Sequence, residues 1–139
     1  MIYVAGHNII LYKLDEKEQY FMPGSKDTEA ITHVSISKTK QFMAVCERCP
    51  VGNKGKFSIF DVTSQKRKKT LPEQIQDMNA FDSQEFIASA FNPKDERYIV
   101  TLTGEPDWQV FMWNWEREKL IAKTSIGGQS NIERNICNF

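Results

Sequence analysis

Residues Phe86–Trp115 read FIASAFNPKDERYIVTLTGEPDWQVFMWNW, and this stretch decides the fold of the chain. It contains three apolar runs, at Phe86–Phe91, Tyr98–Leu102 and Trp108–Trp115. The two segments between them are rich in Asn, Pro, Gly and Asp, which are residues that favour turns. Short apolar runs separated by turns are typical of antiparallel strands, so the stretch predicts a three-stranded meander.

The third run is apolar on both sides of the predicted strand. Because successive side chains of a strand point to opposite faces, Phe111, Trp113 and Trp115 would face one way and Val110 and Met112 the other. A strand that is apolar on both faces is normally covered on both faces. Among antiparallel folds, a β-propeller blade meets this condition, because each sheet packs between two neighbouring sheets. We therefore expect both faces of this strand to be buried.

The same order of elements occurs earlier in the chain. An alternating strand over Ile31–Ser37 is followed by a turn, an apolar strand from Phe42, a loop and a strand that ends in an aromatic and a polar residue. Phe42 corresponds to Tyr98 and Phe60 to Trp113, at offsets of 56 and 53 residues. A strand-rich unit that recurs at such a period is typical of propeller blades joined by long links.

These units predict an all-β fold of antiparallel meanders, arranged as a partial β-propeller with about two full blades plus partial blades. The segment covers 1–139, with full blades at 31–71 and 86–125, a partial blade at 1–24 and the start of another blade at 132–139. Since propellers close with about four to eight blades, we expect missing blades or another chain to complete the ring. The residues predicted to form the structural core are Phe60, Phe91, Tyr98, Phe111 and Trp113.

The composition is that of an ordinary globular domain. Of 139 residues, 40% are apolar and 26% are charged, and the formal net charge is +0 at pH 7. A neutral chain is a poor general binder of polyanions, so we expect no nucleic-acid partner. No apolar run approaches the roughly 18 residues of a membrane span, so we expect no membrane partner. Three cysteines are too few for a disulfide framework and favour a reducing compartment.

Several short motifs resemble those of a known family. Phe60-Asp61 and Trp113-Asn114 stand where a WD40 repeat places its Trp-Asp pair, and Ser37-Lys38 and Asn92-Pro93 stand where it commonly has Ser-Pro. The Gly-His pair that usually opens such a repeat does not precede either full unit, and Gly6-His7 lies in a predicted turn instead. The run YFMPGS at Tyr20–Ser25 is similar to the N-terminal propeller of WD40-repeat proteins of the motile axoneme. The chain thus resembles this family over most of its length.

The resemblance implies a WD40-type propeller that acts as a non-catalytic scaffold in the axoneme of motile cilia and flagella. It implies that the partners are other axonemal proteins, namely dynein-arm or regulatory-complex subunits and the tubulin of doublet microtubules. It also implies a location in the cytoplasm, the cytoskeleton and the cilium. The alternative is a general cytosolic WD40-repeat adaptor that acts in translation or trafficking.

Cysteine and histidine are the strongest candidates for chemistry. Cys46-Glu47-Arg48-Cys49 is a CxxC motif. A structural zinc site needs four ligands, whereas His7, His33 and Cys137 are scattered through other segments. A metal-dependent or redox enzyme that uses the two CxxC thiols is a rival hypothesis, but a redox CxxC needs a βαβ context that is missing. His33 lies on an alternating strand, where a buried structural histidine is expected. We predict no catalytic residue, no metal site and no cofactor.

One basic run is the candidate partner-binding site, and it consists of Lys66, Arg67, Lys68 and Lys69. Four adjacent cations could contact an acidic partner such as a tubulin tail. Lysine also protects exposed sheet edges against unwanted pairing with other strands. We favour this structural role for the run, as part of a solvated hairpin and edge strand.

Overall fold

The computed structural model describes residues 2–13, 17–73 and 79–126, and these residues form eleven β-strands. Every strand pairing is antiparallel. The described residues contain no helix that is long and apolar enough to cross a membrane. The strand predicted at 132–139 lies outside the described residues. The strands are β1 (Ile2–Ala5), β2 (Asn8–Lys13), β3 (Glu18–Pro23), β4 (Ala30–Ile36), β5 (Phe42–Arg48), β6 (Lys56–Asp61), β7 (Arg67–Leu71), β8 (Phe86–Phe91), β9 (Tyr98–Thr103), β10 (Gln109–Asn114) and β11 (Lys119–Ser125).

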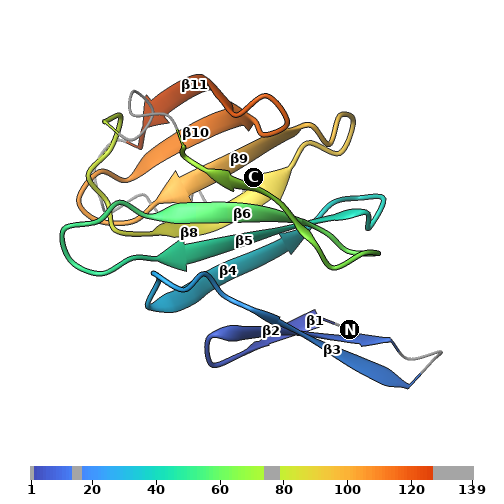
Figure 1. Ribbon diagram of the computed structural model, residues 1–139. Helices are drawn as coiled ribbons and strands as arrows, with labels where there is room; N and C mark the ends of the chain where they lie inside the picture. Colours follow the sequence, from blue (N-terminus) through green and yellow to red (C-terminus); the bar gives the residue numbers. More distant parts are fainter. Residues whose placement is uncertain (1, 14–16, 74–78, 127–139) are drawn as a thin grey trace.

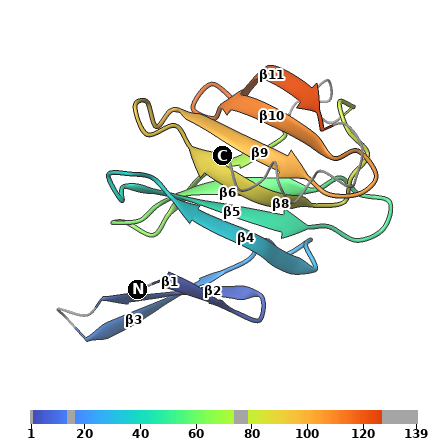
Figure 2. The ribbon, with the colours of Figure 1, turned by 180° about the vertical axis from the view of Figure 1, so that it is seen from behind.

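The strands form three sheets that follow one another along the chain (Figure 1). The first sheet has the order β1-β2-β3, and the other two have the orders β4-β5-β6-β7 and β8-β9-β10-β11. Two opposite views show the β4–β7 sheet between the other two (Figures 1 and 2). Successive antiparallel meanders that pack against one another are arranged like propeller blades. The predicted all-β fold and partial β-propeller are confirmed.

An aromatic cluster fills the space between the β4–β7 and β8–β11 sheets. Phe57 of β6 contacts Phe86 of β8 and Trp113 of β10, with ring centroids 5.2 and 5.5 Å away. All three side chains are fully buried, and both contacts are edge-on, a geometry that aromatic pairs prefer. Trp113 Nε1 donates a hydrogen bond to Thr101 Oγ1 over 2.9 Å. The one polar atom of the largest core residue is therefore satisfied.

A more aliphatic cluster joins the first two sheets, so the middle sheet is covered on both faces. In β5, Ala44 and Cys46 belong to the aromatic cluster, while Met43 and Val45 belong to the aliphatic one. All four side chains are buried, as the two-sided alternation of a strand between two neighbours requires. The buried members of the aliphatic cluster are Ile9, Leu11, Met22, Met43, Val45 and Phe60.

The last sheet is covered on one face by the described residues. Phe111, Trp113 and Trp115 are buried, but Met112 is 38% exposed and Val110 is half-buried. The prediction that both faces of this strand are buried is therefore wrong for the described part of the chain. A strand with apolar residues on both faces needs a neighbouring sheet on each side. Within the described residues, the β4–β7 sheet alone has two such neighbours.

The predicted core residues that are buried are Phe60, Phe91, Phe111 and Trp113. Tyr98 is half-buried, so its assignment to the core is wrong. It lies opposite Asn114, whereas the next residue, Ile99, lies opposite Trp113 and is fully buried. The reason is the alternation of the strand: a shift of one residue moves a side chain to the other face of the sheet.

We expect Trp113→Ala to lower the free energy of unfolding by about 3–5 kcal/mol, because it opens a cavity between two sheets and leaves the Thr101 hydroxyl without its donor. Chemical denaturation followed by circular dichroism measures this loss. Met112→Ala, on the exposed face of the same strand, is the control and should cost less than about 1 kcal/mol. Equal losses in the two variants would contradict the described packing.

Candidate functional site

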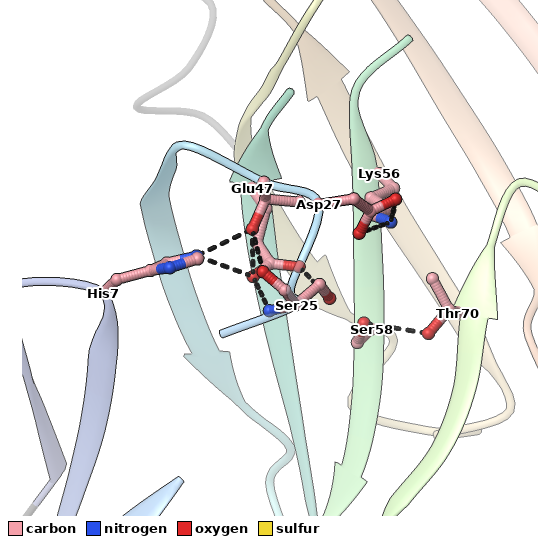
Figure 3. Close-up of polar contacts among 8 residues, drawn as sticks. His7, Ser25, Asp27, Glu47, Lys56, Ser58 and Thr70 are labelled. Atoms are coloured by element: carbon pink, nitrogen blue, oxygen red, sulfur yellow. Dashed lines mark hydrogen bonds and ion pairs between the residues drawn. The ribbon is translucent and has the colours of Figure 1, made fainter. Parts of the chain in front are cut away.

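A buried carboxylate ties the link between the first two sheets to the middle sheet (Figure 3). Glu47 lies near the end of β5 and is fully buried. Its oxygens accept hydrogen bonds from Ser25 N over 2.8 Å and from Ser25 Oγ over 2.7 Å. Thr28 Oγ1 lies 3.1 Å from the same carboxylate. A buried charge is tolerated when it is hydrogen-bonded in this way, so the arrangement fixes the path of the link.

His7 brings the β1–β2 turn into the same network. Its Nε2 lies 2.7 Å from Thr28 Oγ1 and 3.7 Å from Glu47 Oε1, and its carbonyl oxygen accepts a hydrogen bond from Gly24 N over 2.8 Å. A Cβ at Gly24 would lie 2.4 Å from His7 Nε2. A side chain at position 24 would therefore displace His7 or Glu47 from the network.

Serine, histidine and glutamate in this network do not form a nucleophilic triad. In such a triad the histidine lies between the hydroxyl and the acid, so that it takes the hydroxyl proton. In this network Ser25 Oγ donates directly to Glu47, and His7 contacts Thr28 instead. The geometry is that of a structural clamp. Sequence reasoning placed His7 in a hairpin turn and assigned the structural role to His33, which is half-buried on β4.

The same device recurs one sheet further along the chain. Asp107 follows β9 and accepts hydrogen bonds from the backbone nitrogens of Asp82 and Ser83, the second over 2.7 Å. Lys54 Nζ reaches the Asp82 carboxylate and the Phe81 carbonyl oxygen, over 2.7 and 2.6 Å. Each link that precedes a four-stranded sheet is therefore held by a carboxylate.

The two CxxC thiols are poor candidates for chemistry. Cys46 and Cys49 are both free and buried. Burial raises the pKa of Cys46 to about 12, and burial also raises the pKa of Cys49. The thiolate is the nucleophile and the metal ligand, so neither residue supplies it near neutral pH. Among the described residues no group of three or more His, Cys, Asp or Glu could hold a metal ion, and Cys137 lies outside these residues.

The basic run is spread over several contacts and does not form a single cluster. Arg67 lies over the Phe60 ring, 5.1 Å from its centroid, and Lys68 Nζ lies 5.8 Å from the centroid of the Phe42 ring. Lys69 Nζ pairs with Glu118 of the last sheet over 3.0 Å. Lys66 is exposed at the start of the hairpin strand. Arg67, Lys68 and Lys69 thus lie on the edge strand β7 and Lys66 lies directly before it, and their charges do not converge on one site.

A groove between the first two sheets brings one of these cations together with a residue that sequence reasoning did not select. The β3–β7 groove has a volume of about 520 Å³. It contains Arg67 of the basic run and Lys26 of the link between β3 and β4. The two residues are far apart in sequence, and no short motif connects them. The lining residues are Phe21, Met22, Pro23, Gly24, Lys26, Phe60, Ser64, Gln65 and Arg67.

We expect Glu47→Ala to destabilise the chain by about 2–3 kcal/mol, because the buried Ser25 nitrogen and hydroxyl lose their acceptor. Denaturant melts measure the change. Glu116→Ala removes an exposed carboxylate and should stay within about 0.5 kcal/mol of the parent chain. If both substitutions cost the same, the clamp does not contribute to folding.

We expect the thiols of Cys46 and Cys49 to resist modification at pH 8 in the folded chain, because burial keeps them protonated. Ellman's reagent measures this in a Cys137→Ser background, where the two thiols should react only after denaturant is added. Fast reaction of either thiol in the folded chain would overturn the structural assignment and revive the redox hypothesis.

Comparison with known proteins gives two related groups, although no protein-family model matches this sequence. The chain is 28% identical over 95% of its length to cilia- and flagella-associated protein 57 C of Tetrahymena thermophila. It is 28% identical over 94% of its length to cilia- and flagella-associated protein 57 of Mus musculus. It is also 23% identical over 99% of its length to cilia- and flagella-associated protein 52 of Homo sapiens.

The chain spans 10% of the length of the first two relatives and 21% of the third. Among solved structures, a chain in a crystal structure of the mitotic checkpoint complex matches 88% of this chain and 59% of its own length, at 14% identity and a TM-score of 0.40. That likeness is too distant to add to the fold described above. The chain combines a partial WD40-type β-propeller with similarity to cilia- and flagella-associated protein 57 over nearly its whole length.

Proposed function

We propose that this chain is a non-catalytic scaffold segment associated with motile cilia and flagella. The observation that carries the proposal is its 28% identity to two cilia- and flagella-associated proteins over almost its whole length. The fold supports a binding role, since propellers present loops and sheet edges to partners on a rigid frame. The buried thiols and the clamp geometry around Glu47 favour a structural role for the residues that sequence reasoning considered for catalysis.

In finer detail, we place the chain on the doublet microtubules of the axoneme, with dynein-arm or regulatory-complex subunits as its partners. The exposed side chains of Lys66 and Lys68 in the basic run suit individual contacts with acidic proteins such as tubulin. A general cytosolic adaptor in translation or trafficking is the alternative outcome of the test below.

We further propose that additional blades or another chain cover the outer face of the β8–β11 sheet. Strand register places Ala90, Val100, Met112 and Ala122 side by side across its four strands. A second row lies beside the first, with the half-buried Ala88 and Val110 on either side of Leu102, which is already buried. Continuous apolar faces of this kind are rarely left open to water. They suit a neighbouring sheet, as between the blades of a propeller.

The cilium proposal is tested by expressing the tagged chain in multiciliated cells and extracting the cells with detergent. We expect the chain to remain with the insoluble axonemes, because a scaffold is held there by several protein contacts at once. Trp113→Ala, which should disrupt the fold, is the control for nonspecific trapping and should be lost from the axoneme.

Extraction of the chain with the soluble cytosol would contradict the proposal and favour the adaptor. High-salt extraction, followed by immunoblotting, tests the finer claim. Release of the chain together with the dynein arms supports an arm-associated site, whereas retention on the bare doublets places it on the microtubule wall.

A further inference from the structure

The β3–β7 groove is lined by apolar side chains and by two cations. One wall is formed by β3, where Met22 is buried against the middle sheet and the adjacent side chain, Phe21, is 63% exposed at the rim of the groove. The opposite wall carries Phe60, which is buried, and the β6–β7 hairpin. The exposed ring of Phe21 therefore offers apolar contact area at the rim of the groove.

The charge of the groove has one sign. Lys26 and Arg67 line it, and none of the described residues that line it is acidic. Arg67 is held over the Phe60 ring, 5.1 Å from its centroid, so its guanidinium is ordered before a partner arrives. The groove therefore combines an apolar floor with two cations.

The acidic residues next to the groove in sequence are already engaged elsewhere. Both carboxylate oxygens of Asp27 lie 2.6 Å from Lys56 Nζ, and this hydrogen bond holds the pKa of Asp27 below its usual value. Asp61 Oδ1 accepts a hydrogen bond from Ser64 N over 3.0 Å within the hairpin turn. Arg67 also lowers the pKa of Asp27 through its charge, but the direct partner of that carboxylate is Lys56. The hydrogen-bonding positions of the Lys26 and Arg67 side chains therefore remain open to an external anion.

The shape of the groove favours an extended partner. In the described part of the chain β3 pairs with β2 alone, so its other edge has no strand neighbour. Peptides commonly bind at such edges in the extended conformation, with alternate side chains in pockets. Alternation suits this groove, because an acidic residue and an apolar residue would then point toward the cations and toward Phe21 in turn.

We infer that the β3–β7 groove is a docking site for an extended, acidic segment of a partner protein, with Lys26 and Arg67 as the charge contacts and Phe21 as the apolar contact. A nucleic-acid strand is the less suitable occupant, since it requires a longer positive track and the chain has no net charge. The inference does not depend on the cilium proposal, because it uses only contacts within this chain.

The test immobilises the 139-residue chain at low density on a biosensor and adds a peptide of about eight residues that alternates Glu and Val, the period of a strand. We expect this peptide to bind, and a matched peptide that alternates Lys and Val to leave the sensor signal unchanged. Lys26→Glu should weaken binding about five- to tenfold, because it places like charges together. Lys94→Glu makes the same change of charge at an exposed turn distant in sequence and should leave binding unchanged.

Phe21→Ser provides a second, independent variant, and its exposed position makes it compatible with folding. This substitution should also weaken binding of the Glu-Val peptide, by about threefold or more, because the apolar contact is lost. Circular dichroism verifies that each variant is folded.

Several outcomes would overturn the inference. One is equal binding of the Glu and Lys peptides, or no binding of either. Another is equal weakening by Lys26→Glu and Lys94→Glu. A third is tighter binding of a single-stranded oligothymidine, competed away by the peptide, which would assign the groove to nucleic acid.

Discussion

The contact of Phe57 with Phe86 and Trp113 is the interaction on which the rest of the described structure depends. Each sheet of a meander has an apolar face that it cannot bury alone, and these rings supply the shared surface between two sheets. Once these rings are packed, the alternation of side chains along β5 and β6 decides which residues point to the other face of the middle sheet. The first sheet then packs on that face through a smaller aliphatic cluster.

The candidate sites are consequences of this stacking. Chain links must cross from one sheet to the next, and their backbone groups would be left without partners between apolar layers. Glu47 and Asp107 satisfy those groups at the points of crossing. The β3–β7 groove arises where the first sheet meets the outer hairpin of the second. The groove is therefore formed jointly by residues of two sheets, and no single strand forms it alone.

The strands and their order could be predicted from sequence, because turn residues and short apolar runs are local signals. The repeat predicts Tyr98 in the core as the counterpart of Phe42, whereas the register with Trp113 selects Ile99. Double-sided burial is predicted for the strand of Trp113 from its apolar composition, but within the described residues its sheet has a neighbouring sheet on one face alone. The clamp of His7 on Glu47 and the pairing of Lys26 with Arg67 in one groove could not be predicted, because each joins segments that are distant in sequence.

The two ends of the stack are chemically different. The outer face of the first sheet carries the exposed rings of Tyr3 and Phe21, which flank the buried Ile10 in register. The outer face of the last sheet carries small and aliphatic side chains. The large side chains of one face would pack more closely against the small side chains of the other face than either face would pack against a copy of itself. Contacts between copies of the chain would then run head to tail. Such a heterologous contact repeats without limit unless its rotation closes a ring, so the difference between the two faces sets a polarity on any assembly that uses them.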